Sequence, residues 1–362
     1  METFITSLLR ILEFILALGL LIFLHELGHY IASKLFKIEV EEFGFGFPPR
    51  AVKLFQFRET EFTLNWIPFG AFVRPKGEND PEVPGGMAAA KPLVRFAVLL
   101  GGPLMNLLTG VLLFSILFAQ TGAPNERIVI ITSTTPNSPA EQAGILAGDQ
   151  VQAINGTPIQ SMNELSTLVK ANVGTPITIT MLRNGETVDI QLTPRVNPPA
   201  GEGALGIYMS NPVEPVSFFE AIPWGVQITL SQGRQLFELP GKLITGQVNP
   251  EEARMVGPIG MYSIYDNARE EDLETTESQP GTSGLNVLTL LGIISVALGF
   301  TNLLPIPALD GGRILLLLPE LIFRKRIPVQ YENMINLAGF VLLILLMVFV
   351  TAQDILNPIQ IP

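Results

Sequence analysis

Both histidines of this chain lie in one short motif, His25-Glu26-Leu27-Gly28-His29. Residues four apart on an α-helix return to the same face about 6 Å along its axis, so both imidazoles can bind one tetrahedral metal ion. Glu26, on a neighbouring face, can then accept a proton from a water held by that ion. The HExxH spacing is typical of zinc hydrolases. It predicts His25 and His29 as zinc ligands and Glu26 as the catalytic carboxylate.

A third zinc ligand has to be a carboxylate, because the chain has no cysteine and no further histidine. Asp310 is the strongest candidate, since it ends the segment Asn302-Leu303-Leu304-Pro305-Ile306-Pro307-Ala308-Leu309-Asp310-Gly311-Gly312. The two prolines break a helix, which is tolerated at membrane depth only where the backbone is buried in protein or faces water. Two alternatives stay open. Asp310 could simply cap a helix that begins at about Gly312, or the ligand could be Glu320 or Glu332.

Two further segments are candidates for the surroundings of this site. Asn302 has an amide that both donates and accepts, so we predict that it binds the backbone of a substrate strand. The small residues of the run Gly101-Gly102-Pro103-Leu104-Met105-Asn106 permit close helix contact. We predict that Gly101, Gly102, Pro103 and Asn106 pack against the site, and a pure packing role is as consistent with this run as a catalytic one.

The composition indicates a membrane protein. The 362 residues are only 15% charged, and the mean hydropathy is +0.40. A membrane-spanning helix needs about 20 apolar residues. Three stretches are long enough, namely 5–33, 93–119 and 285–304, and a fourth, 335–352, is slightly shorter. The histidine motif therefore falls where the first span is still running, and ionisable groups at that depth are usually functional. No small-residue cleavage site follows this span, which favours a retained helix over a signal peptide.

The distribution of charge predicts the orientation of the four helices. Residues 34–95 hold nine Lys and Arg and residues 313–331 hold four, which by the positive-inside rule places both stretches in the cytosol. Both termini and residues 120–284 are then external. That middle segment has 18 acidic and 8 basic residues, so it gives no basic footprint for nucleic acid.

Between the spans, the sequence predicts a hairpin and one extramembrane domain. Alternating aromatic residues over 38–76 indicate a β-hairpin. It could be an ordinary hairpin beside the membrane. Alternatively, it could dip into the membrane interface and bind an extended peptide as an added strand at its edge. Residues 77–92 read as a flexible loop. In the external segment, a helix over 162–171 and a hairpin around Asn184-Gly185 are predicted. Residues 216–248 favour an amphipathic helix on the outer leaflet over a fifth span, and 266–284 favour a flexible connector.

Two family resemblances follow from these motifs. The string Ser138-Pro139-Ala140, Ala143-Gly144, Gly148-Asp149 and Ile154-Asn155-Gly156 resembles a bacterial PDZ domain over 126–196, which implies peptide binding. The histidine motif, the Asn302–Gly312 run and the PDZ-like insert together resemble the site-2 protease family, of the bacterial RseP type. That resemblance covers essentially the whole chain. It implies zinc bound by His25, His29 and Asp310, Glu26 as catalytic residue, Asn302 contacting substrate, and Phe43–Val73 as a membrane-reentrant β element.

The same resemblance implies a multi-pass protein of the bacterial inner membrane. Its substrates would be single-pass membrane proteins, such as anti-sigma factors already cut outside the membrane. The best-known members carry two PDZ domains, whereas this chain has room for one. A non-enzymatic PDZ receptor is the alternative of another class, but such a protein would not need to keep ionisable groups at this depth.

The predicted fold is thus a polytopic α-helical membrane protein of four transmembrane helices, with a membrane-associated β-hairpin and one inserted PDZ-like α+β domain. The predicted segments are 1–35, 36–92, 93–119, 126–196, 197–284, 285–312, 313–334 and 335–353.

Overall fold

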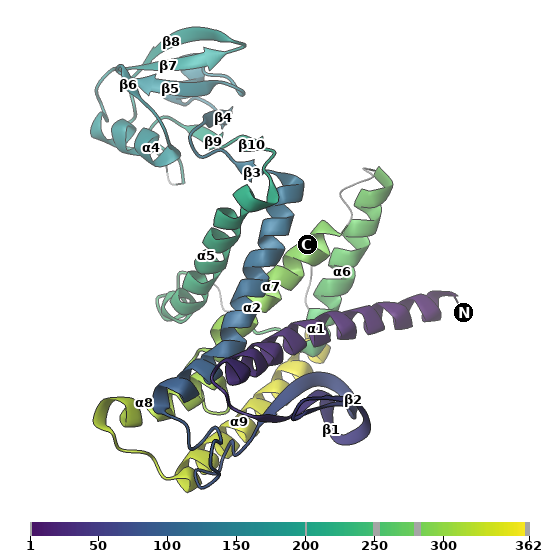
Figure 1. Cartoon of the computed structure of the whole chain (residues 1–362). Coiled ribbons are helices and arrows are strands. Elements are labelled where there is room, and N and C mark those ends of the chain that lie inside the picture. Colours follow the sequence, from purple (N-terminus) through teal and green to yellow (C-terminus); the bar gives the residue numbers. More distant parts are fainter. Residues whose placement is uncertain (1, 200, 249–253, 279–283, 359–362) are drawn as a thin grey trace. The chain divides into compact units, whose positions relative to one another are not determined.

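The computed structural model describes residues 2–199, 201–248, 254–278 and 284–358. It forms two compact units, one from Met1–Leu117 together with Phe218–Pro362, and one from Phe118–Ser217. Figure 1 shows that the first unit is largely helical and that the second contains most of the strands. The described parts of each unit have their own packing, and the units are considered separately below.

Four helices of the first unit are long and apolar enough to cross a bilayer, which confirms the four predicted spans in the described residues. They are α1 (Glu2–Leu35), α2 (Pro92–Thr121), α7 (Leu285–Asn302) and α9 (Val329–Leu356). In α1 and α9 only 11% of the most apolar window is buried inside the protein. Helices that are apolar all round need an apolar surrounding, and a lipid bilayer provides one.

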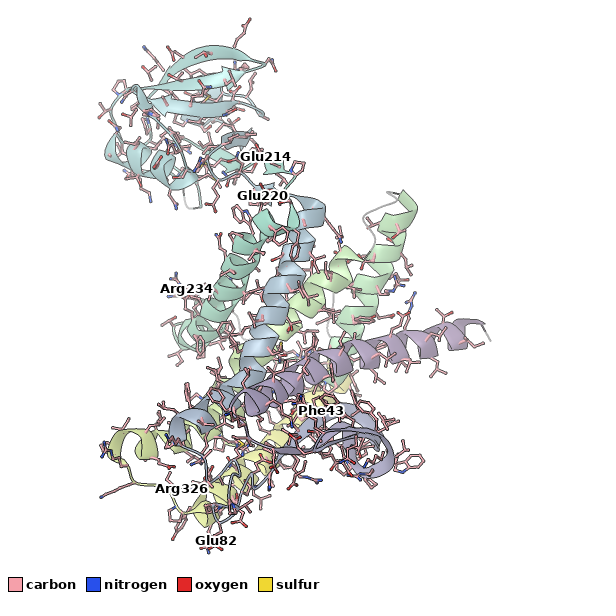
Figure 2. All side chains as sticks on the ribbon, in the orientation of Figure 1. Phe43, Glu82, Glu214, Glu220, Arg234 and Arg326 are labelled. Carbon is pink, nitrogen blue, oxygen red and sulfur yellow. The ribbon has the colours of Figure 1, made fainter. Side chains whose placement is uncertain are left out.

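The predicted hairpin over 38–76 is formed by β1 (Val40–Phe57) and β2 (Thr60–Pro75), which pair antiparallel. Its base packs on α1. Phe43, fully buried and labelled in Figure 2, has its ring 5.5 Å from that of Phe23 and 5.8 Å from that of Tyr30. Residues 50–57 of β1 pair with residues 60–65 of β2, and the apolar side chains of Val52, Leu54, Phe55 and Phe57 are exposed there, as is that of Trp66 in β2. Such a patch is typical of a surface that meets a membrane or a partner.

The loop between the hairpin and α2 is packed at its end. Met87 and Ala88 are buried, and their backbone N–H groups donate to Lys76 (2.8 Å) and Gly77 (3.0 Å). The predicted loop is therefore closed on itself by backbone hydrogen bonds.

The predicted amphipathic helix over 216–248 is α5 (Phe218–Ile244). Ala221, Gly225, Thr229 and Gly233 are buried at every fourth position, so they lie on one face. A Cβ at Gly225 would meet the Ser115 hydroxyl of α2, and one at Gly233 would meet the Phe300 ring of α7. Small residues thus let α5 pack closely on two of the spanning helices. Its location at the outer leaflet stays a prediction.

The prediction of a flexible connector over 266–284 is wrong for its larger part. Residues up to 278 belong to a helix, α6 (Pro258–Ser278), and 279–283 lie outside the described residues. Contacts distant in sequence hold this polar helix in place. Asp266 pairs with Arg10 at 2.9 Å, and Phe14 of α1 packs between Tyr262 and Tyr265. The low apolar content of the segment suggested a connector, but tertiary contacts decided otherwise.

Asp272 of α6 stabilises the start of α7. Its buried carboxylate accepts from the backbone N–H groups of Asn286 (2.9 Å) and Val287 (3.0 Å) at the start of α7. A helix N-terminus has unpaired N–H groups and partial positive charge, so a carboxylate stabilises it.

The second unit is built on an antiparallel sheet in the order β8-β7-β5-β4-β9, with β6 paired to β5. Its strands and helices follow each other as β4 (Val129–Thr134), α3 (Pro139–Gln142), β5 (Gln150–Ile154), β6 (Thr157–Pro158), α4 (Met162–Ala171), β7 (Ile177–Arg183), β8 (Glu186–Leu192) and β9 (Ile207–Ser210). The first and last strands of this unit in the sequence, β3 (Ala123–Pro124) and β10 (Val213–Glu214), form a separate short antiparallel pair.

The predicted local elements of this unit are present. The helix over 162–171 is α4, and the β7–β8 turn has positive φ at Asn184 (51°) and Gly185 (86°), as the Asn-Gly turn requires. The apolar core includes Val129, Ile131, Ile154, Leu165, Ile177, Ile179 and Met181.

Asp149 is the main buried charge of the second unit. Its carboxylate accepts two hydrogen bonds from the Arg183 guanidinium, both at 2.7 Å, and one from the Leu146 backbone N–H at 2.8 Å. The Arg183 hydrogen bonds in particular lower the Asp149 pKa below its ordinary value of 3.8. The charged form of Asp149 is therefore the one that ties β5 to β7 and to the turn after α3.

We predict that Asp149→Asn lowers the free energy of unfolding of this unit at pH 7 by about 1–3 kcal/mol, because Arg183 loses a charged partner. The contribution of Asp149 is fully present above its ordinary pKa. It is lost as the pH falls through the lower pKa of the folded state, so wild type and variant should begin to converge only as the pH falls below 3.8 and become equal below the folded-state pKa.

Hydrogen exchange of the β5 and β7 amides in the full-length protein measures this difference. Asp189→Asn, at an exposed carboxylate of β8, is the control and should cost less than about 0.5 kcal/mol. Equal protection of wild type and Asp149→Asn at pH 7 would contradict the prediction.

Candidate metal centre

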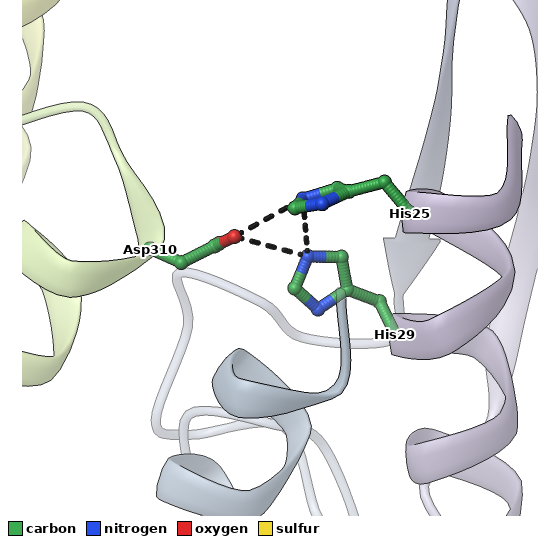
Figure 3. Close-up of side chains that lie close together, drawn as sticks. All are labelled: His25, His29 and Asp310. Atoms are coloured by element: carbon green, nitrogen blue, oxygen red, sulfur yellow. Dashed lines mark hydrogen bonds and ion pairs between the residues drawn. The ribbon is translucent and has the colours of Figure 1, made fainter. Parts of the chain in front are cut away.

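Three side chains from distant parts of the sequence meet beside α1. His25 and His29 lie one helical turn apart, with their Nε2 atoms 3.2 Å apart. Oδ2 of Asp310, from α8 (Asp310–Phe323), lies 3.1 Å from Nε2 of His25 and 3.3 Å from Nε2 of His29. Figure 3 shows the three polar atoms converging on one point. The residues predicted as metal ligands are thus brought together.

The size of this triangle fits a metal ion. A tetrahedral zinc ion with bonds of about 2.0–2.1 Å separates its ligand atoms by about 3.3 Å, which is close to the three separations seen here. Two imidazole nitrogens and a carboxylate oxygen are also a usual donor set for catalytic zinc, with the fourth position open. Two imidazole nitrogens that face each other at 3.2 Å need a shared proton or a cation between their lone pairs. The donor set therefore fits a divalent ion.

The partner of His29 fixes which of its nitrogens can bind a metal. Its Nδ1 lies 2.8 Å from the backbone carbonyl of Val98 on α2. A carbonyl only accepts, so Nδ1 carries the proton and Nε2 keeps its lone pair. This is the arrangement in which the outer nitrogen orients a metal-binding histidine.

Glu26 lies in the same cavity as the three donor atoms. The cavity has a volume of about 250 Å³, and its lining includes His25, Glu26, His29, Val73, Glu78, Asn302, Asp310 and Arg313. The backbone N–H of Val73 in β2 donates to Oε2 of Glu26 at 3.0 Å. The hairpin therefore reaches the cavity and holds the carboxylate predicted as the general base.

The turn between α7 and α8 places Asp310. α7 ends at Asn302 and α8 begins at Asp310, so the prolines of this run do break the helix. Ala308 has a φ of 74° just before α8, which turns the chain sharply. Asp310 lies in the first turn of α8, one residue after the N-cap residue Leu309. Its carboxylate faces the two histidines, which disfavours a mere capping role.

Asn302 lines the cavity at the end of α7. Its amide N–H donates to the Leu298 carbonyl at 3.0 Å. This bond holds the side chain at the cavity wall, where a substrate backbone could contact it. The role of Asn302 in substrate binding stays a prediction.

Glycines at the α1–α2 crossing set the distance between the two helices. A Cβ at Gly28 would collide with the Gly101 carbonyl, so only glycine permits this approach. A Cβ at Gly102 would collide with Nε2 of His29 and lie 2.7 Å from Nε2 of His25. The structure thus places Gly101 against α1 and Gly102 against the donor atoms themselves.

The other two residues of that run have different surroundings. The Pro103 carbonyl approaches Gly299 of α7, which is helix packing outside the cavity. Asn106 is buried, with its Nδ2 placed 3.2 Å from Nδ1 of His25. Of the four residues predicted as site packing, Gly102 and Asn106 touch the histidines.

Glu320 and Glu332, the alternative third ligands, lie elsewhere. Glu320 pairs with Arg95 at 2.8 Å, and Glu332 approaches the same guanidinium at 3.8 Å. Each joins α2 to a later helix and neither belongs to the donor group.

Two features of the site were not found from the sequence. The Val73 N–H is a backbone group and leaves no signal in the residue types. The pair of Arg313 with Glu78, 2.8 Å apart, lies in the cavity wall. Arg313 lies three residues after Asp310, so its place on the same helical face could have suggested it.

Comparison with known proteins places the chain in one family. The model of peptidase family M50 matches residues 13–346. A relative from Clostridium perfringens, whose name describes a zinc metalloprotease, is 34% identical over 348 residues. The match covers 95% of this chain and 98% of the relative's chain. Zinc metalloprotease RasP of Geobacillus kaustophilus is 30% identical over 437 residues, covering 97% and 99%. A solved PDZ domain of an SdrC-like protein from Listeria monocytogenes is 21% identical with a TM-score of 0.21, covering 22% and 85%.

We predict that Gly102→Ala removes metal from the purified protein, because the added methyl occupies the space next to both Nε2 atoms. Metal content per chain, measured by elemental analysis in detergent, should fall by at least about tenfold. Gly19→Ala is the matched control, since a Cβ at this position of α1 meets nothing within 4 Å. Full metal content in Gly102→Ala would mean that the ion binds elsewhere.

Proposed function

The chain belongs to peptidase family M50, and on this basis we propose that it is a zinc-dependent endopeptidase that cuts single-pass membrane proteins within or next to their membrane span. The observation that carries the proposal is the triangle of His25, His29 and Asp310 in one cavity with Glu26. Both histidines lie on a helix apolar enough to cross a bilayer. The names of the relatives, which describe zinc metalloproteases, support zinc as the ion.

The reaction proposed is hydrolysis of a peptide bond. Zinc, when bound, polarises the scissile carbonyl and lowers the pKa of water to about 7. Glu26 accepts the proton of the attacking water and later delivers it to the leaving amine. The Val73 N–H holds the Glu26 carboxylate in the cavity during these transfers. Asp310 and the two histidines hold the metal, and Gly102 leaves space for it.

A substrate would have to be extended at the site. In a helix, each backbone carbonyl is paired and shielded by side chains, so it cannot reach the catalytic groups. Asn302 and the edge of β2 near Val73 lie at the cavity and can hydrogen-bond to an extended backbone. We therefore assign substrate positioning to Asn302 and strand addition to this part of the hairpin.

The proposed setting is the bacterial inner membrane, with both termini and the second unit external and the metal site toward the cytosol. The Lys and Arg bias of residues 34–95 and 313–331 supports this orientation. The exposed apolar side chains of the β1–β2 hairpin suit immersion in the membrane interface.

The second unit is proposed as a PDZ-like domain that binds a peptide or the tail of a substrate. β9 is the last strand in the sheet order, so its outer edge is available for an added strand. In this scheme the substrates include anti-sigma factors after a first external cut, in regulated intramembrane proteolysis.

Cleavage of a single-pass substrate by the purified protein tests the proposal. We expect Glu26→Gln to keep zinc and to lose at least about 10²–10⁴-fold in rate, because the general base is gone. We expect Asp310→Ala to lose zinc and activity together, because one of three ligands is removed.

Glu332→Gln is the matched carboxylate control, since this carboxylate lies 3.8 Å from the Arg95 guanidinium and does not belong to the donor group. It should keep both zinc and most of the activity. If Asp310→Ala keeps its zinc, or Glu332→Gln loses it, the ligand assignment fails.

Helix-breaking residues in the substrate are predicted to favour cleavage. Replacing Leu by Gly or Pro around the scissile bond lowers the cost of unwinding by about 1–3 kcal/mol per site, so kcat/KM should rise by about 5- to 150-fold. Initial rates on a matched series in the same detergent check this. Faster cleavage of the all-Leu substrate would contradict a mechanism that needs local unwinding.

A further inference from the structure

Asn106 of α2 contacts the metal centre from the side opposite to the donor atoms. It is 1% exposed. Its side-chain amide lies 3.2 Å from Nδ1 of His25, while Nε2 of the same ring faces Asp310. Within the described residues, Oδ1 of Asn106 is buried without a hydrogen-bond partner. A buried amide oxygen without a partner is costly, so its surroundings need an explanation.

The chemistry of His25 supplies the missing partner. A neutral imidazole carries one proton, and a ring that offers the lone pair of Nε2 to a metal must carry it on Nδ1. That Nδ1–H needs an acceptor. Rotation of the Asn106 amide by 180° exchanges oxygen and nitrogen in the same space, and the hydrogen-bond network decides between the two orientations. With Oδ1 toward the ring, His25 donates and the amide oxygen accepts, and the amide NH2 takes the former place of Oδ1.

The backbone around Asn106 is held independently. The buried hydroxyl of Ser295 on α7 donates to the Asn106 carbonyl at 2.8 Å. On the same helix, the Val98 carbonyl accepts from His29. Val98 and Asn106 are eight residues apart, a little over two turns, and so share one face of α2. α2 donates no ligand but contacts the outer nitrogen of each histidine.

We propose that Asn106 is a positioning residue that accepts the Nδ1–H of His25 and so presents the Nε2 lone pair to the metal. The inference rests on the metal site of the proposed function but does not depend on proteolysis. The amide oxygen of Asn106 would accept the Nδ1–H of His25, as the Val98 carbonyl accepts the Nδ1–H of His29. Removal of the acceptor weakens metal binding even though no ligand is lost.

Zinc affinity of the full-length protein in detergent, measured by competition with a chromophoric chelator, tests the inference. Asn106→Leu keeps the approximate size but has no acceptor, and we expect zinc to bind about 10–100-fold more weakly. Asn106→Asp keeps an acceptor oxygen, and we expect affinity within a few-fold of wild type. Ser115→Ala, at a buried hydroxyl of α2 that donates to the Val111 carbonyl of the same helix, is the matched control and should bind zinc as wild type does.

A second measurement reads the tautomer directly and does not require the variants to fold. The chain has only two histidines, so protein labelled with ¹⁵N-histidine gives two ring systems. In the zinc-bound wild type, both rings should be protonated at Nδ1. Protonation of His25 at Nε2 would overturn the inference.

The outcomes separate this inference from the proposed function. Zinc affinity of Asn106→Leu equal to that of wild type would overturn the role of Asn106 and leave the zinc site intact. Equal weakening in Asn106→Leu and Asn106→Asp would also overturn it, because shape and not the acceptor would then matter. A wild type that binds no zinc would contradict both proposals.

Discussion

The close crossing of α1 and α2 is the contact on which the site depends. At Gly28 and Gly101 the two backbones touch, and no side chain could stand between them. This approach brings Gly102 against the donor nitrogens and the Val98 carbonyl to His29. Between apolar helices in lipid, packing of small residues provides much of the attraction, because burial from water is absent. The geometry of the metal site therefore follows from a backbone contact between two helices.

A second constraint is that buried charges need partners. Arg95 is 7% exposed and is paired with Glu320, which ties the start of α2 to α8. Arg313, on the same helix as Asp310, pairs with Glu78 in the loop after the hairpin. Removal of one partner from such a pair is costly because the other charge stays buried. These pairs hold α8, and so Asp310, in register with α1 without using the donor atoms.

The hairpin and α6 add contacts that bear on function. β2 reaches Glu26 through the Val73 N–H, so the strand proposed to receive substrate also holds the general base. α6 contacts α1 through Arg10 and Phe14, and α7 through Asp272. It thereby joins the ends of two helices that each contribute to the site.

The sequence by itself determined the chemistry and the four spans. HExxH spacing predicts two ligands and a base on one helix, because four residues make about one turn, and the lack of other His or Cys predicts a carboxylate as third ligand. Apolar length gave the spanning helices. Only the tertiary structure decided that Asp310, rather than Glu320 or Glu332, faces the histidines. It also decided that 258–278 is a helix and that Val73 and Asn106 contact Glu26 and His25. These depend on contacts between residues far apart in the chain, and local residue types do not encode which distant partner a backbone N–H or a buried amide will meet.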